Sequence, residues 1–250
     1  MKKLLLFFSL IASFTINAQW TSQGTGFSAE SRGLNEIKIV DANTVWALAY
    51  DGSGDDANVQ EMTLTTDGGD SWTAKVIELF NPDLEINNLN PVSATTAWVS
   101  ALIPTEGNGV IFKTEDGGDS WTQQLSEGFQ TTGESFINGV HFFNANEGVA
   151  YGDPLGSGAA RRFEIYTTTD GGESWTMIPT GNSPQAQAGE YGYNNSPIVI
   201  GDTIWMTTSK GRLYRSSNKG LNWVAYQVTS LADFGVTLHP HKLELLFSVM

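Results

Sequence analysis

The sequence predicts an all-β protein, a β-propeller of four-stranded antiparallel blades with about four blades present and the ring incomplete. A motif of the form DGG-x-SW recurs along the chain, and its spacing of about 50 residues is the length of one four-stranded blade. Apolar stretches broken by Asn, Asp and Gly turns precede each copy, as in β-hairpins. The 27 glycines and eight tryptophans are typical of a turn-rich β protein rather than a helical one.

The first segment of the chain has the pattern of a secretory signal peptide. A pair of lysines precedes an apolar run over residues 4–16, and Ala18 is a small residue at a suitable cleavage point. The apolar run is too short to span a membrane comfortably. We predict that residues 1–18 are removed, that the mature chain begins at Gln19, and that the protein is secreted or lies at the cell surface or in the periplasm.

A lead-in over residues 19–33 precedes the repeats, which we assign to residues 34–227. Two apolar strands flank a short polar turn at the start of each repeat, over residues 37–50, 91–102, 140–152 and 198–208. The second strand carries, in order, Trp46, Trp98, Val149 and Trp205. An aromatic box for haem or for nucleic-acid bases is one interpretation of these tryptophans. Their recurrence at one register favours core packing instead.

The recurring motif closes a second hairpin in each repeat, and its anchor positions are 49, 54 and 48 residues apart. The aspartate can accept hydrogen bonds from its own turn, the glycines allow positive φ, and the serine adds a second local bond. The tryptophan begins the next strand with a large apolar surface to bury. We therefore predict a structural role. The motif residues are Asp67, Gly69, Ser71, Trp72, Asp116, Gly118, Ser120, Trp121, Asp170, Gly172, Ser174, Trp175, Asn218, Gly220 and Trp223.

The pattern Ser/Thr-x-Asp-x-Gly-x-Ser-Trp resembles the Asp-box, or BNR repeat, of sialidases, sortilin-type receptors and xyloglucan-hydrolysing propellers. The fourth copy departs from it, with Asn218 for the aspartate and Asn222 for the serine. Over its length the chain is most similar to secreted bacterial relatives of the photosystem II stability/assembly factor. The stretches VHFFNANEGVAYGDP and GDTIWMTTSKGRLYRSSNKGLNW carry that likeness. The resemblance implies a propeller whose boxes join the third and fourth strands of each blade, away from the ligand face.

The loops opposite the boxes are long and varied, and function usually collects on such loops. The most unusual is TGNSPQAQAGEYGYNNS, residues 180–196. Arginine can form bidentate hydrogen bonds with a carboxylate and tyrosine can stack on a sugar ring, so an anionic or sugar-like ligand could bind there. Solvated loop residues with local salt bridges are the simpler interpretation, and we favour it. The candidate ligand-face residues are Asp153, Arg161, Arg162, Glu190, Tyr191, Lys210 and Arg212.

Catalytic patterns are weak in this sequence. The sialidases have a Phe/Tyr-Arg-Ile-Pro stretch before the first box and several arginines at the site, whereas Arg32 is the only arginine before Asp67. Asp153 and Glu190 can be proposed as a glycosidase pair, but nothing in their spacing requires it. His141 lies in an apolar strand, so Ser-His-Asp catalysis has little support. We predict no catalytic residue and a binding, assembly or interaction module; the alternative is a glycoside hydrolase with an incomplete site in this chain.

Charge and composition limit the partners. The formal net charge of −14 argues against nucleic acid and anionic membrane surfaces. The chain has no cysteine, which excludes disulfides and thiolate metal sites. The segment DGSGDD at residues 51–56 clusters oxygen atoms but lacks a full calcium-loop pattern, so an acidic solvent loop is the better interpretation. We expect no metal and no cofactor, no membrane insertion after the signal is removed, and a protein or a glycan as the ligand.

The end of the sequence does not resemble a finished blade. After Trp223 the chain enters what would be a fifth blade around residues 231–238, and no box follows. We expect residues 228–250 to be the start of a further blade or an aberrant truncated tail, with a compact four-bladed ring as the alternative. An incomplete ring leaves apolar blade faces and strand edges open, so we also expect residues 19–250 to self-associate.

Overall fold

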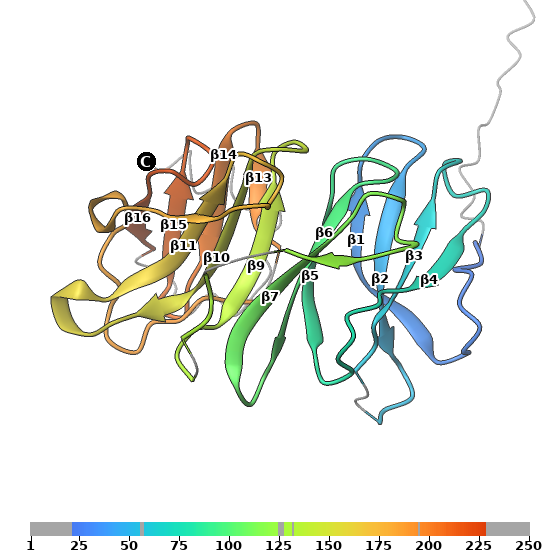
Figure 1. Cartoon of the computed structure of the whole chain (residues 1–250), viewed down its shortest axis with the longest axis horizontal. Helices are drawn as coiled ribbons and strands as arrows, with labels where there is room; N and C mark the ends of the chain where they lie inside the picture. Colours follow the sequence, from blue (N-terminus) through green and yellow to red (C-terminus); the bar gives the residue numbers. More distant parts are fainter. Residues whose placement is uncertain (1–21, 56–57, 125–127, 132, 195, 229–250) are drawn as a thin grey trace, which may run out of the picture.

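The structure is a computed structural model that describes residues 22–55, 58–124, 128–131, 133–194 and 196–228. The predicted signal peptide and nearly all of the predicted tail lie outside these residues. The described chain forms four antiparallel sheets, each of four strands in sequence order. Figure 1 shows these sheets following one another along the molecule, from β1–β4 (blue to cyan) to β13–β16 (orange to red). The all-β fold class with four propeller blades is therefore confirmed.

Each sheet is one blade, and its strands run from the innermost to the outermost. Blade one comprises β1 (Arg32–Ile39), β2 (Val45–Asp51), β3 (Glu61–Thr65) and β4 (Thr73–Val76). Blade two comprises β5 (Glu85–Pro91), β6 (Ala97–Ile103), β7 (Gly107–Thr114) and β8 (Thr122–Gln123). Blade three comprises β9 (Ile137–Phe142), β10 (Gly148–Leu155), β11 (Arg162–Thr168) and β12 (Thr176–Met177), with the 3-10 helices η1 (Gly158–Ala160) and η2 (Thr180–Asn182). Blade four comprises β13 (Ile198–Ile200), β14 (Thr203–Thr207), β15 (Arg212–Ser216) and β16 (Val224–Gln227). None of the described residues belongs to a helix long and apolar enough to cross a membrane.

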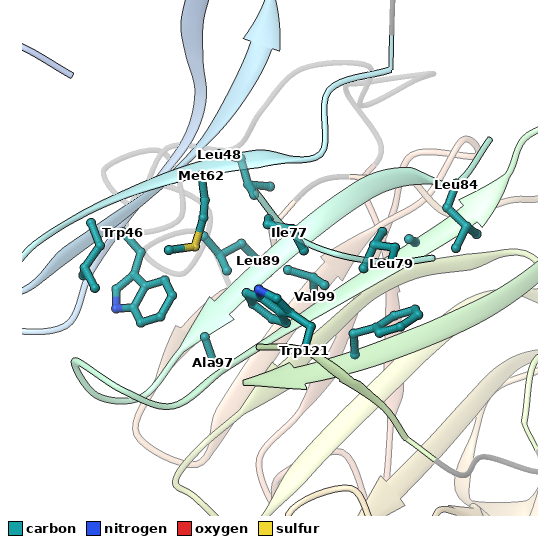
Figure 2. Close-up of a cluster of buried hydrophobic side chains, with 13 residues drawn as sticks. Trp46, Leu48, Met62, Ile77, Leu79, Leu84, Leu89, Ala97, Val99 and Trp121 are labelled. Atoms are coloured by element: carbon teal, nitrogen blue, oxygen red, sulfur yellow. The ribbon is translucent and has the colours of Figure 1, made fainter. Parts of the chain in front are cut away.

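Apolar side chains fill the space between successive blades. Figure 2 shows the cluster between blades one and two, where Trp46 and Leu48 of β2 pack with Leu89 of β5 and Val99 of β6. Trp121, from the box of blade two, belongs to the same cluster. Equivalent clusters join blade two to blade three and blade three to blade four. Each interface buries apolar surface from two sheets, which is the main force holding the blades in sequence.

The recurring tryptophans are core residues. Trp46 and Trp98 are fully buried, and each indole N–H donates to a carbonyl of the following blade, at 3.0 Å to Ser93 and 3.1 Å to Gly171. The ring of Trp98 also stacks on Phe142 of blade three, with centroids 3.5 Å apart. The prediction of core packing is confirmed for these positions, since a ring enclosed in this way is not available to a cofactor or a base.

The predicted boxes close the hairpins between the third and fourth strands. In blade three, Thr168 Oγ1 and the Ser174 N–H both donate to Asp170 Oδ1, at 2.7 and 3.0 Å, and Ser174 Oγ donates to Oδ2 at 2.6 Å. The Gly171 N–H donates to Asn146 O in the turn between β9 and β10. The box and that turn therefore share one end of the blade, which we call the box face. The opposite end, with the longer connections, is the loop face.

The three aspartates of the complete boxes are held in their ionised form. Hydrogen bonds from the serine four residues later lower the pKa of Asp67, Asp116 and Asp170 to about 2. In the fourth box, Asn218 Oδ1 accepts from the Asn222 N–H at 2.9 Å, so the turn keeps its shape without a charge.

The second glycine of a box packs against the preceding blade. A Cβ on Gly118 would lie 2.7 Å from Met62 Cε of blade one, and a Cβ on Gly220 would lie 2.5 Å from Val149 Cγ2 of blade three. Both glycines also have positive φ, a conformation that L side chains rarely adopt. Gly69 of blade one would meet only Trp72 of its own box. The box is thus both a turn and a point of contact between blades.

The two terminal blades each have an open face. Ile37 and Ile39 are 58% and 76% exposed on the face of blade one that is turned away from blade two. Ile200 and Val224 are 69% and 47% exposed on the face of blade four that is turned away from blade three. Within the described residues the blades form an open series rather than a closed ring, in agreement with the predicted incomplete propeller.

Polar side chains link the inner strands near the centre of the molecule. Glu36 Oε2 of β1 accepts from the Leu89 N–H of β5 at 2.8 Å. Lys38 Nζ donates to Ser196 Oγ at 2.5 Å, just before β13, and Ser196 also donates to Glu36. These contacts place the start of blade four beside the innermost strand of blade one.

Candidate functional site

A cavity lies on the loop face between blades three and four, and we call it the loop cavity. Its volume is about 760 Å³. One wall is the connection between β10 and β11, and a second is the connection over residues 180–196 that the sequence singled out. Side chains from both walls and from blade four line it. They include Ser157, Arg161, Gln185, Gln187, Arg212 and Gln227.

Glu190 holds the connection between the two blades in place. Its side chain is fully buried, and its carboxylate accepts from the Gln187 N–H at 2.7 Å and from Thr208 Oγ1 at 2.6 Å. Arg212 Nη1 completes the set with an ion pair at 2.8 Å, and its guanidinium also lies over the ring of Tyr214. A buried carboxylate with three donors, one of them a paired cation, fixes its loop and is not free to react.

Arg161 fixes the same loop from blade three. Its Nη1 donates to Gln187 O at 2.8 Å and its Nη2 donates to Glu190 O at 2.9 Å. Arg212 adds a bond to Gln185 O at 3.0 Å. Both guanidinium groups therefore line the cavity, and some of their N–H groups are already bonded to carbonyl groups of its wall.

Asp153 lies beneath the same connection rather than in the cavity. Its Oδ1 accepts from Asn138 Nδ2 at 3.0 Å and from the Gly192 N–H at 2.8 Å. Burial raises the pKa of this carboxyl, and the two hydrogen bonds oppose that effect. The structure thus brings Asp153 and Glu190 to one loop, where both act as acceptors for its backbone.

The other candidates of the ligand face are dispersed. Tyr191 is 48% exposed and meets Tyr193 edge to face, with ring centroids 5.7 Å apart. Lys210 contributes its carbonyl as an acceptor for Gln227 Nε2. Arg162 points away from the loop cavity and lines a smaller one. Arg161 and Arg212 are the two candidates that line the loop cavity itself.

His141 and Asp51 of the acidic loop are each bonded to groups of the chain itself. Burial, with the charge of Lys38 as a second cause, lowers the pKa of His141 to about 3, and Asn90 Nδ2 donates to its Nδ1 at 3.1 Å. Asp51 accepts from Ser53 and Arg32. In the part of the chain that the structure describes, no three His, Asp or Glu side chains are grouped as metal ligands would be.

Sequence reasoning found the loop but missed much of the cavity wall. The glutamines at 185, 187 and 227 line the cavity, and nothing in their type or spacing marked them beforehand. Sequence reasoning also missed Glu164 in β11, which is buried at 2% exposure. A carboxylate within an apolar strand is a signal that can be recognised, since such a group is rarely buried without partners.

No family model matches this sequence, and no curated protein matches it. Several solved structures are similar in fold. The structure of YCF48 from Cyanidioschyzon merolae is 16% identical, with a TM-score of 0.54 over 82% of this chain and 59% of that one. The Hadza microbial sialidase Hz136 is 11% identical, with a TM-score of 0.50 over 81% of this chain and 46% of that one. YCF48 bound to D1 peptide is 14% identical, with a TM-score of 0.41 over 79% of this chain and 67% of that one.

These identities show a shared propeller fold and nothing finer. The chain spans about three fifths of the first of these proteins and less than half of the second. The fold that the Asp-box resemblance implied is thereby confirmed, and membership of the BNR family stays a prediction. YCF48 and a sialidase share this fold, and propellers host unrelated functions, so the fold does not choose between binding and catalysis.

Proposed function

We propose that this chain is a binding module that takes its ligand in the loop cavity, without performing chemistry on it. One observation carries the proposal. Neither Asp153 nor Glu190 lines the cavity, and both carboxylates are occupied by groups of the chain itself. A glycosidase needs two carboxyl groups that face the scissile bond. The glycoside hydrolase alternative has no support from this cavity.

We propose a protein segment as the ligand. The lining residues of the cavity include no aromatic side chain on which a sugar ring could stack, among those that the structure describes. The arginines and glutamines instead provide donors, and the glutamines also provide acceptors, which suits the amide groups of an extended peptide. The glycines at 156, 158 and 189 in the cavity wall let a backbone approach closely. The signal-peptide pattern supports binding outside the cytoplasm.

Blocking the cavity tests the proposal. Ala188 lines the cavity and is exposed, so Ala188→Trp fills space without removing a hydrogen bond. Thr169→Trp, on an exposed residue of the box face of the same blade, is the matched control. Peptide and glycan libraries are screened with the full chain. We expect peptide hits that weaken at least about tenfold in Ala188→Trp and are unchanged in Thr169→Trp.

Hydrolysis is measured on the same samples. We expect no turnover of sialosides or β-glucans above background. Turnover that disappears in folded Asp153→Asn and Glu190→Gln variants would establish the hydrolase instead. Peptide binding that survives Ala188→Trp would move the ligand site away from this cavity.

A further inference from the structure

Another cavity lies on the loop face between blades one and two, and we call it the tyrosine cavity. Its volume is about 430 Å³, which is enough for a small ligand or a single side chain of a partner. Blade one contributes the end of β2 and the connection that follows it, and blade two contributes the start of β5. The polar and aromatic side chains that line it are Asn35, Tyr50, Asp51, Asn58 and Glu85.

The ring of Tyr50 forms one wall of this cavity and is supported from behind by a glycine. Tyr50 is the cross-strand partner of Gly33 in β1, and a Cβ on Gly33 would lie 2.5 Å from Cζ of the ring. Because glycine has no side chain, the ring can lie this close to the neighbouring strand. Tyr50 nevertheless remains 48% exposed. One side of the ring is therefore packed on β1, and the other is an open flat surface.

Carboxylate and amide oxygens surround the ring of Tyr50. Asp51 is the next residue, and its Oδ2 accepts from Ser53 Oγ at 2.7 Å, which fixes the orientation of the carboxylate. Asn58 Nδ2 donates to two carbonyl groups of the connection between β4 and β5, at 3.5 and 3.4 Å, so its Oδ1 is left as an acceptor. Glu85 is exposed at the first position of β5. The cavity therefore presents mainly hydrogen-bond acceptors.

The tyrosine cavity also carries negative charge that its surroundings do not neutralise. No lysine or arginine is among its described lining residues. Arg32 pairs with Asp51 at 3.3 Å, but it is shared with Glu61 at 3.1 Å. No ion pair within the described residues includes Glu85. A recess lined by one sign of charge attracts the opposite sign, so this cavity favours a cation, in contrast with the arginine-lined loop cavity.

A flat ring, several acceptors and a net negative charge together select a planar cation with several donors. A guanidinium group has five N–H donors and no acceptor. It also stacks on aromatic faces and forms paired hydrogen bonds with carboxylates. An ammonium group is a compact, strongly hydrated charge without a plane to stack. A sugar hydroxyl both donates and accepts, so it would find few donors in this cavity.

We propose that the tyrosine cavity binds an arginine side chain of a partner protein. The guanidinium plane lies on the open side of the Tyr50 ring, and its N–H groups donate to the carboxylates of Asp51 and Glu85. This site is separate from the loop cavity and does not depend on the function proposed there.

Four small molecules test the charge, the plane and the donor pattern separately. Ethylguanidinium carries the head group of arginine, ethylurea is its neutral planar counterpart, pentylammonium is a cation of similar size without the plane, and methyl glucoside represents sugars. Each is titrated into the ¹⁵N-labelled full chain at constant ionic strength, and the amide signals of Tyr50, Asp51 and Glu85 are followed by NMR. We expect saturable shifts with ethylguanidinium, with a Kd in the millimolar range because the ligand is small. Binding of the other three should be at least about fivefold weaker, and the Gln187 signal of the loop cavity should not move.

Two variants and one control locate the contact. Glu85→Gln keeps the size of an exposed side chain and removes its charge, and it should weaken ethylguanidinium binding about fivefold. Tyr50→Leu still covers Gly33 with an apolar side chain but removes the ring, and it should weaken binding about threefold. Glu106→Gln is the matched control, because it makes the same change of charge on an exposed residue of the loop face of the same blade as Glu85. We expect it to leave binding unchanged.

Several outcomes overturn the proposal. Equal affinity for ethylguanidinium and ethylurea means that the cavity does not recognise charge, and tighter binding of pentylammonium or methyl glucoside assigns it to that chemistry. No saturable shift with ethylguanidinium means that the cavity holds no guanidinium group. Equal losses in Glu85→Gln and Glu106→Gln leave only long-range attraction by an acidic surface. If Tyr50→Leu does not fold, unchanged binding in Glu85→Gln still removes this cavity as the site.

Discussion

The box face and the loop face of this propeller are stabilised in different ways. On the box face each complete box bonds polar groups of its own turn, as Asp170 does with Ser174, and the same arrangement recurs at Asp67 and Asp116. On the loop face the important contacts are single and distant in sequence, as between Arg212 and Glu190. Repeated local bonds tolerate change in one copy, whereas a unique buried pair does not.

The largest expected effect is the loss of Arg212. Arg212→Ala leaves the fully buried Glu190 carboxylate without its cation, and removing one partner of a buried pair costs about 3–5 kcal/mol. Urea unfolding of the full chain measures the free energy. The control is Lys219→Ala on the box face, where the partly exposed pair with Glu147 is expected to contribute less than about 1 kcal/mol. Equal losses in the two variants would contradict the distinction between the faces.

The second-largest effect on stability is expected at the box glycines, which act both as turn residues and as points of contact between blades. Gly220→Ala combines an unfavourable φ with a clash against Val149 of the preceding blade, and we expect a loss of about 2–4 kcal/mol. Gly69→Ala has the unfavourable φ but meets only its own Trp72, so about 1–2 kcal/mol is expected. Thermal unfolding of both variants gives the comparison. If Gly69→Ala is as costly as Gly220→Ala, contact between blades is not the reason for the second glycine.

Most of the fold was accessible from the sequence because it depends on residues that repeat. The box fixes the end of each third strand, and recurring residues such as Trp46 and Trp98 fix which face is buried. The loop cavity was located only in outline, because it depends on contacts of the kind that Arg161 makes with Gln187 and Glu190 across 26 and 29 residues. Such contacts leave no periodic pattern in the sequence from which they could be predicted.

A smaller effect is expected from removing one box aspartate. Asp170→Ala removes an acceptor for Thr168 and Ser174 in an exposed turn, and we expect a loss of about 1–2 kcal/mol. Asp170→Asn keeps one oxygen, as Asn218 does in the fourth box, and should lose less. Peptide binding in the loop cavity is measured in parallel and should not change, because the box lies at the opposite end of the blade. Lost binding with unchanged thermal stability would reverse the structural assignment of the boxes.

The smallest effect concerns the missing charge of the fourth box. Asn218→Asp restores the carboxylate of the other three boxes, but Asn222 provides a backbone N–H at 2.9 Å and no serine hydroxyl. We therefore expect the free energy of unfolding to change by less than about 0.5 kcal/mol at pH 7.

The pH dependence of stability is a more informative test of the box carboxylates. A carboxyl whose pKa is lower in the folded than in the unfolded chain adds stability above the unfolded value, and this is lost as the pH falls through the folded value. For Asp67, Asp116 and Asp170 that window runs from the usual aspartate pKa of 3.8 to about 2. Urea unfolding between pH 5 and pH 2 should therefore show a shallower loss for Asp170→Asn than for the unmodified chain. Identical slopes would mean that the box carboxylates are no better stabilised when folded than when unfolded, and the turn alone would account for the motif.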